Sequence, residues 1–550
     1  MGVGVSPPET GAGGALYTCG EVVTLEAEQP SAEALAISNG RILRVGDETE
    51  CRAALRAAGI VDVEHVDLGG RCVLPGFIDT HLHPIGLLYF DMNADLRGTR
   101  SVADVQAVLQ QAAVHAPPGE WIVGLQLEDE ALAERRLPTA TELDAACPER
   151  AVVVLEHDGH SAIGNTAALV AAGIGPDFPD PAGGRIARDA KGVPTGACFE
   201  SAAQRLFGVV PAPSLERLRA TAGASFRRLA ACGITSAGVV LQTDAEGPGG
   251  EAGRLESLAM QLLLGDACFA TYAILIGRSV DAAVAARTSP LHDPAAGRRV
   301  GGFKIFADGT FGSCTAHMRA PFADRPGERG MATLPREEIQ ARMRSAHAAG
   351  LQICVHAIGD AAIDHCVDLF EELLREVPRH DHRHRIEHAS LLPPDLIERL
   401  ARLAICVSTQ PLFIHSEKTW LDRRLGGERA RFAYPLRALV DAGVAVGGAS
   451  DAPVESTDVL HAIQCCVTRE GFHPEQALSP AEALRLFTRG AAYLQFEENE
   501  KGSLAASKRA DLVVLSANPL AVPADQISAI RVVRTVCAGR TTFDAEGQIV

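Results

Sequence analysis

Eight short apolar runs separated by helical stretches constrain the fold of this chain more than any other feature of its sequence. One run, VLPGFIDTHLH, occupies residues 73–83. The other seven lie at residues 233–241, 268–277, 300–309, 351–360, 384–390, 404–411 and 443–453. Apolar, β-branched runs that alternate with helical segments are typical of βαβ units, and eight such units make a (β/α)8 barrel, the TIM barrel. The sequence therefore predicts an α/β protein built on this barrel.

Two further parts are expected around the barrel. Residues 15–72 read as short strands with a hairpin turn at Asn39–Gly40, and strands recur near the C-terminus. The two ends, residues 1–72 and 496–550, are predicted to form one small β-sandwich domain beside a barrel at 73–495. His81 and Ile234, on the first two barrel strands, are 234 − 81 = 153 residues apart. A typical crossover between two neighbouring barrel strands is much shorter than this interval. A large α/β subdomain is therefore predicted as an insertion after barrel strand 1, at about residues 88–215.

Composition excludes several kinds of partner. The chain has 550 residues and a formal net charge of -18, without a dense basic segment, so nucleic acid is not an expected partner. No apolar run is long enough to span a membrane, and the N-terminus lacks the pattern of an export signal, so no membrane partner is expected. The 14 cysteines are scattered without a Cys-x-x-Cys motif, which favours reduced, mostly buried thiols and a cytoplasmic location.

Polar side chains with metal-binding chemistry follow or end five of the predicted strands. Parallel barrel strands bring their C-terminal ends to one face, so these side chains are expected to meet there. They are His81, His83, Lys304, His356, His388 and Asp451. Neutral imidazoles and a carboxylate are ligands of divalent metals, and a set that leaves positions open for water is catalytic in type. A lone His-x-His pair, taken alone, is equally compatible with two hydrogen-bonded histidines at a strand end.

Longer motifs carry a resemblance to a known family. They include LPGFIDTHLHP, FKIFADGTFGSCTA, GLQICVHAIGDAAID, HRIEHAS, GGASDAPV and GSLAASKRADLVVLSANP, and they extend over nearly the whole chain. In these motifs the sequence resembles the amidohydrolase superfamily, in particular its amidohydrolase 3 branch, which includes N-substituted formamide deformylases. The resemblance implies a metal-dependent hydrolase of non-peptide carbon–nitrogen bonds, with zinc as the expected metal and one or two ions per chain.

By this resemblance, Lys304 would be N-carboxylated and would bridge two metal ions. His81, His83 and Asp451 would hold one ion, and His356 and His388 the other. Asp451 would also act as the general acid and base. In the alternative, the site holds one ion and Lys304 is a structural or substrate-pairing cation. Both alternatives stay open at this point, because the sequence shows neither the carboxylation of Lys304 nor the number of metal ions.

Four further residues are weighed as substrate-binding candidates. Asp308, in KIFADG, is compatible with a metal or substrate contact and equally with a turn. Asp360 precedes an amphipathic helix and is favoured as its N-cap, with a place in the pocket as the alternative. His160, in HDGHSAIGN, and His415, in TQPLFIH, are each compatible with a substrate contact or a structural role. In the histidine-rich run RHDHRHRIEH, only His388 is expected at the site, and the rest is interpreted as a solvated loop.

The expected function is hydrolysis of a small linear amide, such as an N-substituted formamide or an N-acyl amine. Departures from the branch, among them LQLEDE after WIVG and Ile163 after GHSA, leave the substrate open. The alternatives are a cyclic amidase or ring deaminase with one metal, and a non-catalytic metal-binding regulatory protein on the same barrel. Pairing of two copies as a homodimer is compatible with the sequence, although no segment specifies an interface.

Overall fold

The structure is a computed structural model. It describes residues 13–547 except 118, 157–160, 182–183, 212 and 248–249. The chain forms two compact units. One contains Met1–Ile85 and Phe226–Val550, and the other contains Gly86–Ser225. The predicted domain boundaries at 72, 88, 215 and 495 remain a prediction.

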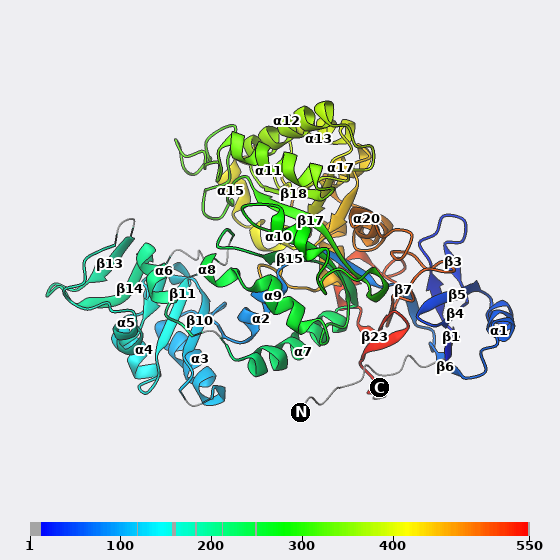
Figure 1. Ribbon diagram of the computed structural model, residues 1–550, viewed down its shortest axis with the longest axis horizontal. Coiled ribbons are helices and arrows are strands. Elements are labelled where there is room, and N and C mark those ends of the chain that lie inside the picture. The colour runs from blue at the N-terminus through cyan, green and yellow to red at the C-terminus, as the bar shows by residue number, and fades with distance from the viewer. Residues whose placement is uncertain are drawn as a thin grey trace. The chain divides into compact units, whose positions relative to one another are not determined.

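The first unit is built on a nearly closed barrel of eight parallel strands, as the sequence predicts (Figure 1). Neighbouring strands pair in chain order, from β8 through β15 to β21. Where β8 and β21 meet, the Thr80 hydroxyl donates to the Gly448 carbonyl at 3.0 Å. The strands are β8 (Phe77–Leu82), β15 (Ile234–Gln242), β16 (Ala270–Ile276), β17 (Arg298–Phe306), β18 (Gln352–Ala357), β19 (Arg385–His388), β20 (Cys406–Thr409) and β21 (Val446–Gly448).

Helices occupy most of the segments between and after these strands. Among them α12 carries apolar side chains at helical spacing, and Ile363, Val367 and Phe370 are buried. The helices are α9 (Glu256–Leu263), α10 (Asp281–Ala286), α11 (Arg336–Ala348), α12 (Asp360–Glu376), α13 (Pro394–Arg402), α14 (Leu412–Glu417), α15 (Leu421–Leu425), α17 (Leu436–Asp441), α18 (Val459–Thr468), α19 (Pro480–Leu486) and α20 (Arg489–Leu494).

The first barrel strand is shorter than predicted. Residues 72–75 form a separate strand, β7 (Cys72–Pro75), which pairs with β2 (Glu21–Val23) and β22 (Leu512–Leu515) outside the barrel. The chain passes into the barrel at Gly76, where a Cβ would lie 2.3 Å from the Thr235 side chain. The apolar run therefore contains strands of two different sheets. Its apolar pattern does not show where the first strand ends and the second begins.

Strands from the two ends of the chain share a sheet. Its order is β24-β23-β22-β7-β2-β3, with β3 (Ser31–Ala32), β23 (Val532–Cys537) and β24 (Arg540–Asp544) completing it. In Figure 1 the red strand β23 lies near β7. A second sheet has the order β5-β4-β1-β6, from β1 (Gly14–Thr18), β4 (Ala34–Ser38), β5 (Arg41–Gly46) and β6 (Val63–Asp67).

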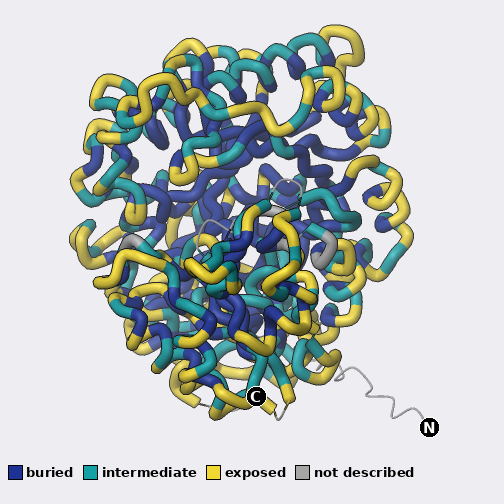
Figure 2. The backbone as a smooth tube through the Cα atoms, turned by 90° about the vertical axis from the view of Figure 1, so that its left-hand side faces the viewer, coloured by how far each residue is buried: buried dark blue, intermediate teal, exposed yellow. Residues whose placement is uncertain are grey.

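The predicted hairpin turn at Asn39–Gly40 is confirmed. It joins β4 to β5, and both residues have positive φ, 51° for Asn39 and 73° for Gly40. Two successive residues with positive φ are typical of the tight turn that matches the twist of a hairpin. Between the two sheets lies an apolar core from both chain ends, which includes Leu35, Val73 and Val514. Buried segments of the chain are drawn dark blue in Figure 2.

The second unit has its own sheet and core. Its six strands have the order β13-β14-β12-β11-β10-β9. Leu109 of α3 (Val102–His115) and Leu143 of α4 (Ala140–Ala146) are buried in one core with Val154 of β11 (Val152–Glu156). The other strands are β9 (Ala94–Asp95), β10 (Ile122–Leu127), β12 (Ser161–Gly164), β13 (Gly184–Arg188) and β14 (Pro194–Glu200), and the other helices include α5 (Thr166–Ala171) and α6 (Ser201–Phe207).

All 14 cysteines are free, and ten of them are buried, as the scattered spacing predicts. Among the described residues, no helix combines the length and the apolar character needed to cross a membrane.

The prediction of a solvated loop for the histidine-rich run is wrong for its second half. His382 and His384 are buried. His384 Nε2 lies 2.8 Å from His347 Nδ1, and the Ile353 amide donates to His384 Nδ1 at 3.0 Å. His382 Nε2 lies 3.0 Å from the Leu403 carbonyl. Each ring therefore has hydrogen-bond partners suited to a neutral imidazole, which is why polar residues can be buried here.

This histidine group predicts acid sensitivity. Burial, together with His382 and Arg379, lowers the pKa of His384 well below its ordinary value. Below about pH 6.5 the unfolded chain takes up a proton that the folded protein does not, so the free energy of unfolding falls with decreasing pH, by up to about 1.4 kcal/mol per pH unit for one histidine. We expect the melting temperature to fall from pH 7.5 to pH 5.

Two variants test whether His384 causes the acid sensitivity. His384→Gln should flatten the dependence of melting temperature on pH, whereas the same change at the exposed His380 should leave it unaltered. Equal pH dependence in wild type and His384→Gln would show that other groups cause the acid sensitivity.

Candidate metal centre

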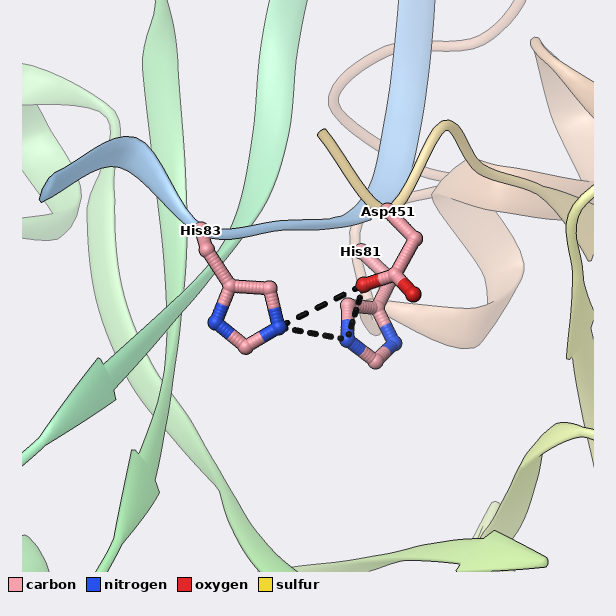
Figure 3. A group of neighbouring side chains, drawn as sticks. All are labelled: His81, His83 and Asp451. Carbon is pink, nitrogen blue, oxygen red and sulfur yellow. Dashed lines mark hydrogen bonds and ion pairs between the residues drawn. The ribbon is translucent and has the colours of Figure 1, made fainter. Parts of the chain in front are cut away.

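The C-terminal ends of β8 and β21 bring three of the predicted residues together (Figure 3). Asp451 Oδ1 lies 3.3 Å from His81 Nε2 and 3.3 Å from His83 Nε2. The two Nε2 atoms are 3.4 Å apart. The Asp451 amide donates to the His81 carbonyl at 2.8 Å, so the backbone fixes this approach.

A hydrogen bond determines which nitrogen of His81 carries a proton. His81 Nδ1 lies 2.7 Å from a carboxylate oxygen of Glu387, and both residues are fully buried. A carboxylate accepts, so Nδ1 donates and Nε2 keeps its lone pair. Burial, with the nearby Lys304, lowers the pKa of His81 to about 4, so the ring is neutral near pH 7. The lone pair of Nε2 faces His83 and Asp451.

The side chain of Lys304, on β17, lies beside His81 of the same group. Its ammonium nitrogen lies 3.4 Å from His81 Nε2, and its side chain is almost completely buried. Burial lowers the pKa of Lys304, although Glu387 and Asp451 act in the opposite direction. The structure therefore places a buried amine beside the group, as the order of the strands predicts.

His356 and His388 lie next to each other, with ring centroids 4.5 Å apart. The His81 and His388 rings are 5.3 Å apart, so the second pair adjoins the first group. His388 Nδ1 lies 2.9 Å from Gln410 Oε1, which leaves Nε2 as the lone-pair nitrogen when the amide oxygen accepts. His356 Nε2 lies 3.1 Å from the Gly309 carbonyl, so its lone pair is on Nδ1.

Unusual backbone conformations occur at two of these residues. His388 has φ 71° and Asp451 has φ 59°. In a regular strand Glu387 and His388 would point to opposite faces, yet Glu387 bonds His81 and the His388 ring lies beside it. The left-handed conformation at the end of β19 lets both residues face the site. Such conformations in non-glycine residues are strained and concentrate at functional sites.

The donor set fits a divalent metal ion. Oδ1 of Asp451 and the Nε2 atoms of His81 and His83 are close enough to share one ion. Burial acts to raise the pKa of Asp451, but its interactions with His81, His83 and His388 hold it below its ordinary value, so the carboxylate is ionised. Two imidazoles and a carboxylate with converging lone pairs are an established ligand set for such ions.

Asp308 and Asp360 have structural partners. The Asp308 carboxylate accepts from the amides of His317, Ile358 and Gly359 at 2.8–3.0 Å and has an oxygen 3.7 Å from His356 Nε2. It therefore organises the loop beside His356. The N-cap interpretation of Asp360 is wrong by one residue, because Gly359 is the N-cap of α12. The Asp360 carboxylate instead accepts from the Arg319 amide at 2.8 Å.

His415 belongs to a second polar group. It is exposed on α14, and its Nδ1 lies 2.9 Å from the Glu470 carboxylate, which also contacts His461 at 3.1 Å and pairs with Lys418. A substrate contact of His415 remains a prediction. The predicted candidate His160 lies outside the described residues.

Three residues that hold the site in place were missed by the sequence reasoning. Glu387 orients His81, and Gln410 orients His388. Asp79 accepts from the amides of His81 and Ser450, at 3.0 and 3.2 Å, and so joins the ends of β8 and β21. Asp79 lies two residues before His81 in a strand, so both side chains are expected on the same face. This spacing is a signal in the sequence for the place of Asp79 at the site. No local signal in the sequence distinguishes the roles of Glu387 and Gln410.

Comparisons with known proteins show which family and which relatives the chain is similar to. The model of the amidohydrolase family matches residues 64–543. The N-substituted formamide deformylase of Arthrobacter pascens is 29% identical over 553 residues, 96% of this chain and 97% of the relative. The Arabidopsis thaliana protein LONG AFTER FAR-RED 3 is 29% identical over 530 residues, 94% of this chain and 89% of the relative.

A solved structure extends the likeness to three dimensions. An uncharacterized metal-dependent hydrolase from Pyrococcus furiosus has a TM-score of 0.75 and 28% identity, and the match covers 92% of this chain and 100% of that one. The likeness in fold therefore extends over most of the chain.

Proposed function

The chain belongs to the amidohydrolase family, and on that basis we propose that it hydrolyses a non-peptide carbon–nitrogen bond in a small linear amide. The observation that carries the proposal is the convergence of His81 Nε2, His83 Nε2 and Asp451 Oδ1 on one point. The deformylase relative supports an N-substituted formamide as the substrate class. The reaction consumes the amide and water and releases a carboxylic acid and an amine.

Asp451 is the proposed general base and acid. An ion held by His81, His83 and Asp451, with zinc favoured by the nitrogen-rich donor set, would supply Lewis acidity and lower the pKa of a water molecule. Asp451 Oδ2 is not the oxygen that faces the two histidines, so it is free to accept a proton from the attacking water. The carboxylic acid then donates this proton to the leaving nitrogen, which departs as the amine.

We also propose that Lys304 is N-carboxylated. A neutral amine reacts with carbon dioxide to give a carbamate and a proton, and the lowered pKa of Lys304 favours the neutral amine. The carbamate oxygens then provide ligands that an ammonium group does not. His356 and His388 would hold a second ion.

An assay on small amides tests the function. Metal-loaded protein should release amine from N-substituted formamides or N-acyl amines and should lose this activity after chelation. Activity only on cyclic amides or ring amidines would favour the cyclic amidase or deaminase. If no amide is hydrolysed and Asp451→Asn retains full biological function, the protein is a metal-dependent binder instead.

A further inference from the structure

A cavity of about 390 Å³ lies at the N-terminal ends of the barrel strands, opposite the end that carries the metal centre. Tyr272 is near the start of β16, Arg299 is the second residue of β17, and Gln352 begins β18. Sites of barrel enzymes lie at the other face, so this basal cavity is a separate feature. Besides these three, its walls include Arg287, Arg379 and Gln495.

Two arginines of the basal cavity donate hydrogen bonds to backbone carbonyls. Arg287 donates to the carbonyls of Ala349 and Gly350, at 2.9 and 3.0 Å. Arg379 donates to the carbonyls of Leu351 and His382, at 3.4 and 3.2 Å. Over the part of the chain that the structure describes, neither guanidinium has a carboxylate within ion-pair distance. Burial lowers the pKa of Arg379, Tyr272 and the Asp381 carboxylate act in the opposite direction, and the positive charge of Arg287 adds to the lowering.

The other charged groups around the cavity are already paired. Arg299 lies 3.3 Å from a carboxylate oxygen of Glu497. Asp381, the acidic residue of the cavity wall, binds Arg383 at 2.7 Å. The cavity therefore has an excess of two positive charges, in a chain whose net charge is -18. Such an excess at a concave site favours an anion.

Gln495 gives an independent indication of a ligand. Its side chain is fully buried at the cavity, yet both the amide nitrogen and the amide oxygen have no hydrogen-bond partner among the described residues. A buried amide with neither partner is costly, and such groups usually find one in protein, water or ligand. A bound molecule with hydrogen-bonding groups would satisfy it.

We propose that the basal cavity binds a small organic oxyanion, with its charged group between Arg287 and Arg379. Guanidinium groups bind carboxylates and phosphates through paired, charge-assisted hydrogen bonds. A hydroxyl or amide on the body of the ligand pairs with Gln495. The site is independent of the metal centre and of the reaction proposed there.

Calorimetric titration of the metal-loaded protein tests the site, with inorganic phosphate and succinate as separate probes. Wild type should bind one of them, and the probe that binds identifies the ligand as a phosphate or a carboxylate. Arg287→Gln/Arg379→Gln should bind at least tenfold more weakly. Arg423→Gln, the same change at an exposed position of α15, should bind as wild type does. Unchanged metal content in each variant separates this site from the metal centre.

A second variant guards against misfolding of the double mutant. Gln495→Met removes two unpaired polar atoms, so it should raise the melting temperature of the ligand-free protein while weakening binding several-fold. Failure of wild type to bind either probe at millimolar concentration would overturn the proposal. Equal weakening in Arg423→Gln, or unchanged binding in Arg287→Gln/Arg379→Gln, would overturn it as well.

Discussion

Replacing Asp451 by asparagine should lower kcat/KM for amide hydrolysis by about 10²- to 10⁴-fold, the usual contribution of a positioned general acid or base. The amide of asparagine keeps the size of the side chain but neither accepts a proton at neutral pH nor returns one to the leaving nitrogen. The variant should remain folded, because the backbone bond from residue 451 to the His81 carbonyl is unaffected. Steady-state kinetics with metal content measured in parallel checks this.

Asp511→Asn is a matched control. Asp511 is also buried and accepts from Arg509 at 3.0 Å, but it lies just before β22 of the terminal sheet. It should lose stability and keep kcat/KM per folded molecule. Equal losses of activity in the two variants would mean that Asp451 acts through stability and not through chemistry.

Replacing Glu387 by glutamine should lower metal affinity by about 10- to 100-fold, as the loss of a group that orients a metal-ligating histidine does. Glu387 also pairs with the fully buried Arg385, whose Nε lies 2.5 Å away. Removing one partner of a buried ion pair leaves the other charge uncompensated and costs about 3–5 kcal/mol of stability. Chelator competition and thermal unfolding measure the two effects separately.

Glu497→Gln is the matched control for Glu387→Gln. Glu497 is buried and pairs with Lys501 at 2.7 Å, away from the site residues. Its replacement should lower stability but leave metal affinity unchanged. A Glu387→Gln protein with wild-type metal affinity would rule out the orienting role of Glu387.

The barrel was predictable because its signal is repeated. Each of the eight predicted strands is present, since buried parallel strands read as continuous apolar runs. Their ends were predictable only roughly. Residues 73–75 read as part of the first strand but pair with β22, because an apolar pattern does not show which sheet buries it. Predicting the hairpin at Asn39–Gly40 succeeded because positive φ at both positions is a local property.

For the site, residue types at strand ends predicted which side chains meet, but not what holds them. The motif HRIEHAS indicates no separate role for Glu387, because the bond of Glu387 to His81 joins positions 306 residues apart. The charged neighbours of His384 predict that it is exposed, whereas hydrogen bonds with His347 and the Ile353 amide allow its burial. Such partners are set by tertiary packing, which local patterns do not encode.

The number of metal ions per chain, measured for wild type and Lys304→Ala after purification with bicarbonate, tests whether Lys304 bridges two ions. Two ions are expected in wild type and one or none in the variant, because the buried amine beside His81 would supply the bridging carbamate. The same number of ions in both proteins would contradict the bridge, and one ion in each would favour a mononuclear site.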